Sequence, residues 1–258
     1  MIVLASDYDG TLKIKGQIAE SDLDAIRAFQ AAGNKFGIST GRTIGMIKYE
    51  LIKYNVPFDF MICGNGGILV DSDYNVIERF DIDFNDALEM IEEAAKDPEI
   101  SLSISDGDRY GRLQESATKV VRVSHQAPEP SPAQVDGKVI VEGGVVGTFV
   151  LSHSDVTKAR DVYDRFSERF EGKMSFHYNN AVIDVGPAGV DKKTGIDVLA
   201  KWLNNPVHVI GDSHNDLPMI EAFNGYAVSH GHEDVKEKAS MIFDSVKDCI
   251  EYLMKNEK

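Results

Sequence analysis

Short apolar runs alternate with helical stretches through the first part of the chain, and this alternation constrains the fold more than any other feature. Residues 2–6, 35–39 and 60–63 are apolar runs of strand length. Between them, residues 21–33 and 44–55 carry apolar side chains at helical spacing. A β-α-β-α-β order of this kind predicts a parallel sheet with right-handed crossovers.

The alternation stops after residue 82 and resumes after residue 187, where helix 194–203 and strand 207–210 follow. We therefore predict an α/β protein with a Rossmann-like parallel sheet core, built from residues 1–82 and 188–258. Residues 83–187 would form an inserted α+β domain.

Within the insertion, the pattern predicts a helix over residues 85–96 with Leu88, Ile91 and Ala95 turned inward. Residues 120–123 and 139–141 are apolar enough to predict short strands. The loop 126–132 contains three prolines, so it cannot pair as the interior of a strand.

The charge of the chain excludes some partners. Among its 258 residues, 42 Asp and Glu outnumber 27 Lys and Arg, for a net charge of −15. Nucleic acids and anionic membranes require a basic surface, so neither is an expected partner. Without a signal peptide or a long apolar span we expect a cytoplasmic monomer or weak homodimer, and we expect Cys63 and Cys249 to be inert core residues.

Carboxylates gather directly after two of the predicted strands. Asp7 and Asp9 follow the first strand, and Asp212 and Asp216 follow strand 207–210. Ligands of an open α/β sheet bind beyond the carboxyl ends of its strands, so these side chains should converge there. Four ionised carboxylates would repel one another unless a cation joins them, and an all-oxygen set suits Mg²⁺.

A second group of polar residues also lies at strand or helix ends. Residues 40–42 (TGR) follow the second strand, Asn65 follows the third, and Lys192 and Lys193 come just before a predicted helix. Each has a structural alternative when taken alone. Thr40 could cap a helix, Asn65 could occupy a left-handed turn, and Lys192 could be solvated.

Histidines also come close together in the sequence. His230 and His232 flank Gly231, and His214 lies nearby. This arrangement invites a transition-metal site, but it lacks a third convincing ligand, so we favour Mg²⁺ held by the carboxylates.

Together these motifs resemble the haloacid dehalogenase-like (HAD) phosphatases. Residues 7–12 (DYDGTL) match their DxDGTL signature, residues 40–42 match their second motif, and Lys192 matches the lysine of the third. Residues 211–216 (GDSHND) match the GDSxND fourth motif. The insertion between the second and third motifs resembles the C2-type cap of the Cof-type subfamily (IIB).

The resemblance implies a Mg²⁺-dependent phosphatase acting on small phosphomonoesters, with sugar phosphates as the commonest class, through an aspartyl-phosphate. Asp7 would be the nucleophile, and Asp9 would protonate the leaving group and then activate water. The implied metal ligands are Asp7, Asp9 through its main-chain carbonyl, Asp212 and Asp216. The small phosphorylated metabolite would be held partly by the inserted domain.

The remaining motif residues have implied roles at the phosphoryl group. Thr40 and Gly41 would bind its oxygens, Lys192 would neutralise its developing charge, and Asn215 would bind substrate and support the metal shell. Lys193 stands where the family more often has Gly, so it is an alternative to Lys192. Arg42 could contact the phosphate or pair with a neighbouring carboxylate, and we assign it no catalytic role. Asn65 could contact substrate or position the hairpin that follows it, with the left-handed turn as the structural alternative.

Other functions compete with this interpretation. A phosphomutase uses the same machinery, and a sugar-phosphate-binding regulatory protein could use the same fold without catalysis. The regulatory protein would not need Asp9, which is present. A dinucleotide-binding oxidoreductase is disfavoured because the loop after the first strand lacks the GxGxxG turn.

Overall fold

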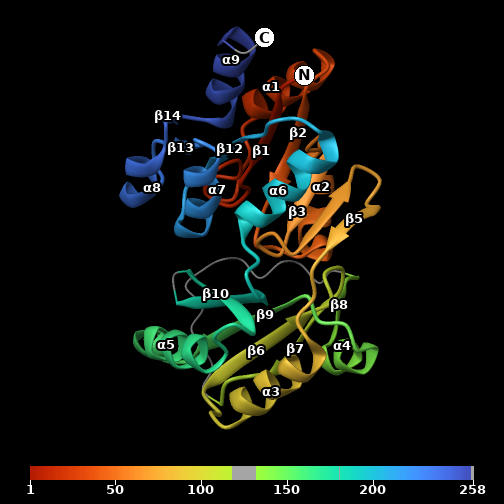
Figure 1. Cartoon of the computed structure of the whole chain (residues 1–258), viewed down its shortest axis with the longest axis vertical. Coiled ribbons are helices and arrows are strands. Elements are labelled where there is room, and N and C mark those ends of the chain that lie inside the picture. The colour runs from red at the N-terminus through yellow and green to blue at the C-terminus, as the bar shows by residue number, and fades with distance from the viewer. Residues whose placement is uncertain (118–131, 180, 257–258) are drawn as a thin grey trace. The chain divides into compact units, whose positions relative to one another are not determined.

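A computed structural model of the chain describes residues 1–117, 132–179 and 181–256 and divides into two compact units (Figure 1). The first unit comprises Met1–Gly41, Leu51–Arg79 and Asp191–Lys258. The second comprises Arg42–Glu50 and Phe80–Val190, so the insertion predicted at residues 83–187 falls within it.

The first unit is built on an eight-stranded sheet in the order β14-β13-β12-β1-β2-β3-β4-β5. Six of these strands run parallel, and two form an antiparallel hairpin at one edge. The parallel strands are β1 (Val3–Ser6), β2 (Lys35–Ser39), β3 (Phe60–Cys63), β12 (His208–Gly211), β13 (Tyr226–Val228) and β14 (Met241–Phe243). The hairpin strands are β4 (Ile68–Asp71) and β5 (Val76–Arg79). The predicted α/β class with a parallel sheet core is confirmed.

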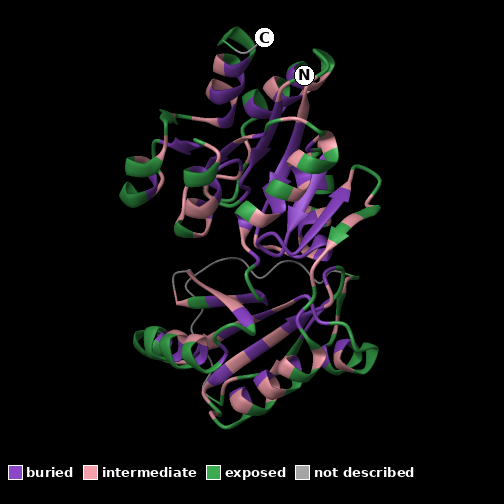
Figure 2. Cartoon of the chain, viewed as in Figure 1, coloured by how far each residue is buried: buried purple, intermediate pink, exposed green. Residues whose placement is uncertain are grey.

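Helices bury the parallel strands of this sheet (Figure 2). Those of the first unit are α1 (Glu20–Ala31), α6 (Lys192–Leu203), α7 (Leu217–Ala222), α8 (Glu233–Lys238), α9 (Val246–Asn256) and the 3₁₀ turn η2 (His214–Asp216). Helix α2 (Ile44–Tyr54) belongs partly to each unit. Side chains of β1, β3 and β12 share one apolar cluster with α6 and α7, while α1 packs against α9.

The second unit is a six-stranded sheet in the order β10-β11-β9-β6-β7-β8, antiparallel except where β7 pairs with β8. Its strands are β6 (Ile100–Ser105), β7 (Tyr110–Gln114), β8 (Gln134–Asp136), β9 (Thr148–His153), β10 (Met174–Asn179) and β11 (Val182–Pro187). Its helices are α3 (Phe84–Ala95), α4 (Gly137–Gly143), α5 (Ala159–Arg169) and the 3₁₀ turn η1 (Val156–Lys158). One apolar cluster joins the sheet to α3, α4 and α5.

Two local predictions for the insertion were wrong. Residues 139–141 belong to α4 and not to a strand, because the Asp136 carboxylate caps the helix at Lys138 N–H and Gly144 ends it at φ 71°. Helix α3 buries Ala87, Met90 and Ala94, whereas Leu88 is 38% exposed. The buried stripe therefore lies one residue earlier in the chain than predicted, with two alanines and a methionine facing the sheet. Residues 120–123 and nearly all of loop 126–132 lie outside the described residues.

Both cysteines are buried, and burial raises the pKa of each thiol above its ordinary value. Over the parts of the chain that the structure describes, every helix is too short or too polar to cross a bilayer.

Candidate active site

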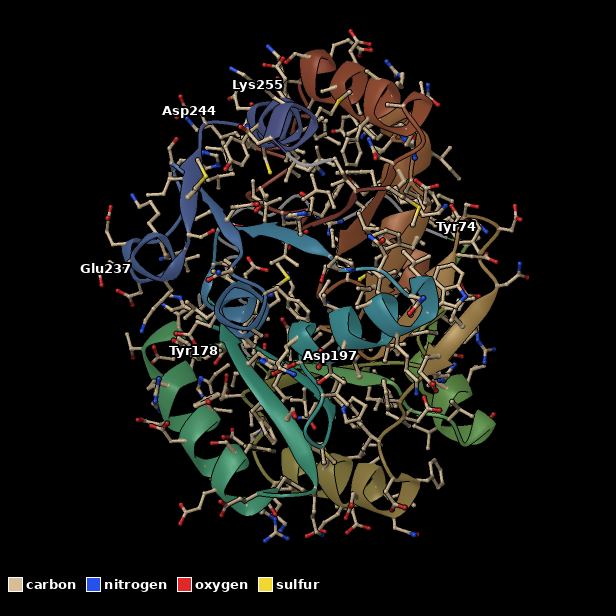
Figure 3. The ribbon with its side chains drawn as sticks, turned by 45° about the horizontal axis from the view of Figure 1, so that its top comes forward. Tyr74, Tyr178, Asp197, Glu237, Asp244 and Lys255 are labelled. Atoms are coloured by element: carbon tan, nitrogen blue, oxygen red, sulfur yellow. The ribbon has the colours of Figure 1, made fainter. Side chains whose placement is uncertain are left out.

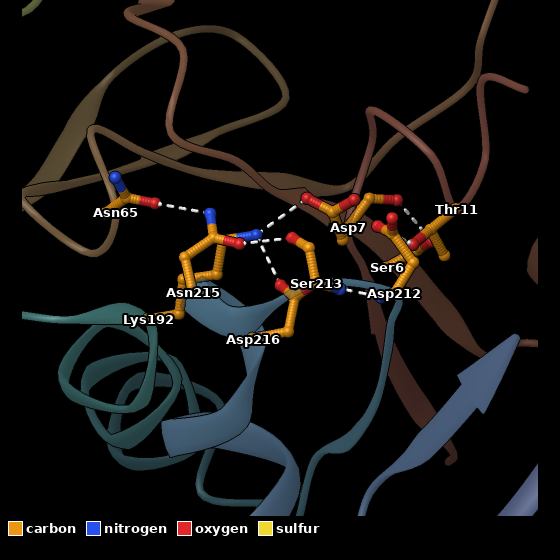
Figure 4. Close-up of polar contacts among 9 residues, drawn as sticks. All are labelled: Ser6, Asp7, Thr11, Asn65, Lys192, Asp212, Ser213, Asn215 and Asp216. Atoms are coloured by element: carbon orange, nitrogen blue, oxygen red, sulfur yellow. Dashed lines mark hydrogen bonds and ion pairs between the residues drawn. The ribbon is translucent and has the colours of Figure 1, made fainter. Parts of the chain in front are cut away.

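The pairing of β1 with β12 brings two motif loops to one edge of the first unit's sheet. The strands run parallel in register, with Ser6 opposite Ile210. Asp7 continues the ladder, since its N–H donates to the Ile210 carbonyl at 2.9 Å. Asp212 leaves β12 directly beyond this point, so residues about two hundred apart in sequence emerge side by side (Figure 4).

Three carboxylates form the centre of the site. Asp7, Asp212 and Asp216 each place an oxygen so that all three oxygens lie within 4.8 Å of one another. Asp7 and Asp216 are buried, and Asp212 is half-buried. Asp7 Oδ2 is buried without a hydrogen-bond partner among the described residues. A buried acceptor left in this state, beside two more carboxylates, fits a divalent cation with oxygen ligands.

Lys192 supplies the balancing charge from the first turn of α6. Its Nζ donates to Asp7 Oδ1 at 2.7 Å and to Asp216 Oδ1 at 2.5 Å, and its side chain is fully buried. The helix starts here because Asp191 and Thr194 form a capping box. The start of α6 therefore fixes Lys192 between two carboxylates.

Lys193 lies next in the chain but is placed differently. Its Nζ pairs with Asp197, one turn further along α6, and about half of each side chain is exposed. Asp197 is labelled on α6 in Figure 3. Consecutive helix residues point about 100° apart, so only one of the two lysines can face the carboxylates.

The pKa values of the cluster follow from its burial and its charges. Burial raises the pKa of Asp7 well above its usual range, and the attraction of Lys192 opposes this only partly. Burial and then the charge of Asp216 raise the pKa of Asp212. Burial would lower the pKa of Lys192, but Asp216 and Asp7 outweigh it and the pKa lies above its ordinary value. Lys192 is therefore an ammonium, and in the absence of a metal the protonated forms of Asp7 and Asp212 are favoured more than those of ordinary carboxyl groups.

Asp216 also folds the loop that carries Asp212. Its Oδ2 accepts the N–H groups of Asp212 at 3.0 Å and Ser213 at 3.1 Å. Thr11 Oγ1, from the first motif, donates to Asp212 Oδ1 at 3.0 Å. A Cβ on Gly211 would lie 2.5 Å from Asp216 Cγ, so only glycine fits there. The loop thus presents Asp212 while Asp216 stays beneath it.

The second motif lies next to a pair of asparagines. Asn215 Nδ2 donates to Asn65 Oδ1 at 3.1 Å, and Ser213 Oγ donates to Asn215 Oδ1 at 2.6 Å. Asn65 adopts a left-handed backbone conformation with φ 51°, which was one of the alternatives for this residue in the sequence analysis. Its N–H donates to the main-chain carbonyl of the buried Thr40 at 3.0 Å. A Cβ on Gly41 would lie 3.1 Å from the Asn65 amide, so this turn leaves little room for a side chain.

Asp9 stands apart from the three clustered carboxylates. Its side chain is exposed, and the cluster does not include it. Its loop is closed by two main-chain hydrogen bonds, from Lys13 N–H to the Tyr8 carbonyl at 2.7 Å and from Gly10 N–H to the Lys13 carbonyl at 3.0 Å. The structure therefore places Asp9 two residues after the buried Asp7, at a solvent-facing position. Arg42, which precedes α2, is half-buried.

Sequence reasoning missed Ser213, Thr11 and one histidine as supports of the site. Ser213 and Thr11 lie inside motifs that the sequence identifies, so their location near the site could be predicted. The partners of their hydrogen bonds could not. His230 Nε2 lies 2.7 Å from the Gly10 carbonyl, a contact that no local pattern signals. The centroids of the His214 and His232 rings lie 4.8 Å apart with the ring planes tilted by 54°, but across the described residues no three-ligand cluster contains a histidine.

Comparisons with known proteins agree with this architecture. A protein from Plasmodium vivax described as a HAD/COF-like hydrolase superposes with a TM-score of 0.80 at 21% identity, over 98% of this chain and 94% of that one. The HAD subclass IIB sugar phosphatase BT4131 superposes with a TM-score of 0.80 at 21% identity, over 99% and 98%. These likenesses establish the fold.

Sequence relatives cover the same length. An uncharacterized protein of Mycoplasma capricolum is 24% identical over 261 residues, which is 94% of this chain and 97% of that protein. The Bacillus subtilis 5-amino-6-(5-phospho-D-ribitylamino)uracil phosphatase YcsE is 26% identical over 248 residues, covering 94% and 90%. The profile of the haloacid dehalogenase-like hydrolase family matches residues 4–250. With nearly its whole length matched, the chain belongs to the haloacid dehalogenase-like hydrolases.

Proposed function

We propose that the chain is a Mg²⁺-dependent phosphatase that hydrolyses small phosphomonoesters through an aspartyl-phosphate on Asp7. The observation that carries this proposal is the buried Lys192 ammonium, which bridges Asp7 and Asp216 within the three-carboxylate cluster. A carboxylate can attack an anionic phosphate only where cations offset the repulsion. The lysine supplies one such charge, and the carboxylates can hold the second.

The residues present fit a magnesium ion. Carboxylates of Asp7, Asp212 and Asp216 and the main-chain carbonyl of Asp9 would hold it, with Asp7 Oδ2 as the oxygen that lacks a hydrogen bond in the described chain. When bound, Mg²⁺ would neutralise phosphoryl charge and orient the group for in-line attack.

In the first step, a carboxylate oxygen of Asp7 attacks phosphorus while the bond to the leaving oxygen breaks. Asp9 donates its carboxyl proton to that oxygen, so the alcohol departs neutral. The Lys192 ammonium stabilises the charge that spreads over the phosphoryl oxygens. In the second step, Asp9 takes a proton from water, the water oxygen attacks phosphorus, and the Asp7 carboxylate is released with inorganic phosphate.

Neighbouring groups would bind the phosphoryl group during both steps. We assign the Thr40 hydroxyl and the Gly41 N–H to its oxygens, because both follow β2 directly at the strand edge. Asn215 is assigned to substrate binding, and its orientation is set by Asn65 and Ser213. We assign Lys192 and not Lys193 as the active-site lysine, on the burial and contacts described above.

For the substrate, we propose a phosphorylated sugar or sugar alcohol. The relative from Bacillus subtilis is named for a phosphorylated ribityl compound, and sugar phosphates are the class that the sequence resemblance implies. We further propose that the inserted residues 83–187 act as a C2-type cap domain that contributes substrate specificity, as in Cof-type proteins.

Hydrolysis of p-nitrophenyl phosphate by the whole chain tests the proposal. Asp7→Asn should abolish turnover while the fold persists, and Lys193→Met should remain active as the matched control. EDTA should abolish activity and added Mg²⁺ should restore it. An active Asp7→Asn variant or activity that survives exhaustive chelation would contradict the proposal.

A panel of phosphorylated metabolites then identifies the substrate class. The product decides between the two reactions that share this machinery, because a phosphatase releases inorganic phosphate and a phosphomutase passes it to a second hydroxyl. We expect inorganic phosphate from sugar or sugar-alcohol phosphates. A preference for phosphorylated compounds without hydroxyl-bearing carbons would contradict the proposed class.

A further inference from the structure

Residues 229–232 connect β13 to α8 within the first unit, and the proposed function does not use them. This segment nevertheless touches both loops that carry the clustered carboxylates. His230 Nε2 lies 2.7 Å from the Gly10 carbonyl. The His232 N–H donates to the Asp212 carbonyl at 2.8 Å. One tetrapeptide therefore joins the loop of Asp7 to that of Asp212.

The three segments meet with little room between them. A Cβ on Gly10 would lie 2.3 Å from Asp212 Oδ2, and Gly10 adopts φ +93°. A Cβ on Gly231 would lie 2.9 Å from the Asp212 carbonyl oxygen. Glycines thus allow both neighbouring loops to approach Asp212 directly. A displacement of Gly10 would therefore shift the position of the Asp212 carboxylate.

The tetrapeptide is itself anchored to the sheet. The Ser229 N–H donates to the Phe243 carbonyl of β14 at 2.8 Å, and the Gly231 N–H donates to the Val228 carbonyl at 2.9 Å. Lys236 Nζ donates to the Ser229 carbonyl at 3.2 Å. His230 thus projects from a supported position, and it links Gly10 to a part of the chain 220 residues away.

The contact with Gly10 determines which imidazole nitrogen of His230 carries a proton. A main-chain carbonyl only accepts hydrogen bonds, so His230 Nε2 must carry the proton and donate it to Gly10. Both the neutral Nε2–H tautomer and the imidazolium can donate in this way. The contact therefore does not depend on the charge of the histidine. A side chain of similar size without a donor would lose it.

We propose that His230 is a positioning residue, which holds the Gly10–Thr11 peptide and thereby fixes Gly10 against Asp212. The contacts that close the loop from within run between Tyr8, Gly10 and Lys13 and move with it. His230 instead ties the Gly10 carbonyl to the loop that follows β13, two strands away from β1 in the sheet. Through Gly10 it holds both the carboxyl of Asp9, the proposed proton donor, and the Asp9 main-chain carbonyl, a proposed metal ligand. The catalytic part of this inference rests on the proposed function.

The experiment compares His230→Met with His230→Gln, which are similar in size but differ in the N–H donor. Mg²⁺ alone is titrated into the full chain by calorimetry. His230→Met should bind Mg²⁺ about fivefold more weakly than the wild type, the effect of losing one modest hydrogen bond. His230→Gln should stay within about twofold of the wild type. Equal affinities in all three proteins, or equal losses in both variants, would overturn the inference.

Kinetics provide a second readout that a merely structural role would not move. In His230→Met, kcat/KM for an alkyl phosphate should fall more than for p-nitrophenyl phosphate, because only the alkoxide needs a proton from Asp9. Equal losses on both substrates would overturn the positioning of Asp9. A wild-type chain that neither binds Mg²⁺ nor hydrolyses phosphomonoesters would instead contradict the proposed function. A wild type that does both, with His230→Met unchanged in both assays, would contradict this inference alone.

Discussion

Replacement of Lys192 by Met tests how the buried charges of the site are balanced. The lysine ammonium is fully buried and lies within hydrogen-bond distance of the carboxylates of Asp7 and Asp216. Methionine keeps the length and the apolar stem but removes the charge. The metal-free variant would still hold the three neighbouring carboxylates of Asp7, Asp212 and Asp216. It would lose the ammonium that donates to Asp7 Oδ1.

The size of the loss follows from this burial. Removing one partner of a buried ion pair typically lowers the free energy of unfolding by about 3–5 kcal/mol. For a chain of this length that corresponds to a fall in Tm of roughly 6–20 °C. The loss should shrink at acid pH, because protonation of the carboxylates removes the repulsion that the lysine had balanced. Asp216→Asn in the Lys192→Met background should recover part of it, since one unpaired charge is then gone.

Thermal and denaturant unfolding in EDTA measure this effect, with Lys193→Met as the matched control. Lys193 is solvent-exposed and pairs with Asp197 on the same helix, so its replacement should change Tm little. Equal changes in Tm for Lys192→Met and Lys193→Met would refute the reasoning. A double variant that is no more stable than Lys192→Met would show that Asp216 is not the carboxylate left unbalanced.

Three further perturbations probe the same site. Asp9→Asn should lower kcat/KM for an alkyl phosphate by about 10²–10⁴-fold but spare p-nitrophenyl phosphate, and steady-state kinetics showing equal losses would exclude Asp9 as the acid. Gly10→Ala should weaken Mg²⁺ binding in calorimetry because its Cβ would meet Asp212, whereas Gly16→Ala, also at positive φ but with nothing within 4 Å, should not. Burial raises the pKa of Asp7 and Asp212, so protonation stabilises the metal-free protein at low pH and this stabilisation is lost as pH rises. The increase in Tm on adding Mg²⁺ should therefore grow from about pH 5 to about pH 8, and a decrease would contradict the sign.

The architecture of the first unit was predictable because its determinants are local. Apolar runs and helical periodicity defined the strands and helices around Asp7 and Asp212. Parallel strands end at one edge, so the convergence of these carboxylates followed from the pattern. The motif matches located Thr40 and Asn215 in the same way.

The choice between Lys192 and Lys193 could not be made from the sequence. The two residues are adjacent and chemically identical, and only the capping box at Asp191 sets which side of α6 each one faces. The contact of His230 with Gly10 was unpredictable for a related reason. The order of the strands in the sheet brings together the loops that carry Gly10 and His230. No sequence pattern within either loop predicts that order.

The errors in the insertion arose where short apolar runs carry little information. Residues 139–141 fit a strand or a buried helix equally well, and the cap at Asp136 decided the outcome. In α3, the large side chain of Leu88 was expected inside, but Ala87 and Ala94 occupy the buried stripe. Packing against the sheet, and not the hydrophobicity of single residues, set the face of this helix.

Detection of the phosphoryl group on the enzyme tests the central claim most directly. The full chain is mixed with Mg²⁺ and a good substrate from the panel, quenched in acid within one turnover, digested and analysed by mass spectrometry. We expect the added mass of one phosphoryl group on the peptide that contains Asp7, and its absence in Asp7→Asn. A phosphoryl group on any other side chain, or turnover without one on Asp7, would contradict the account.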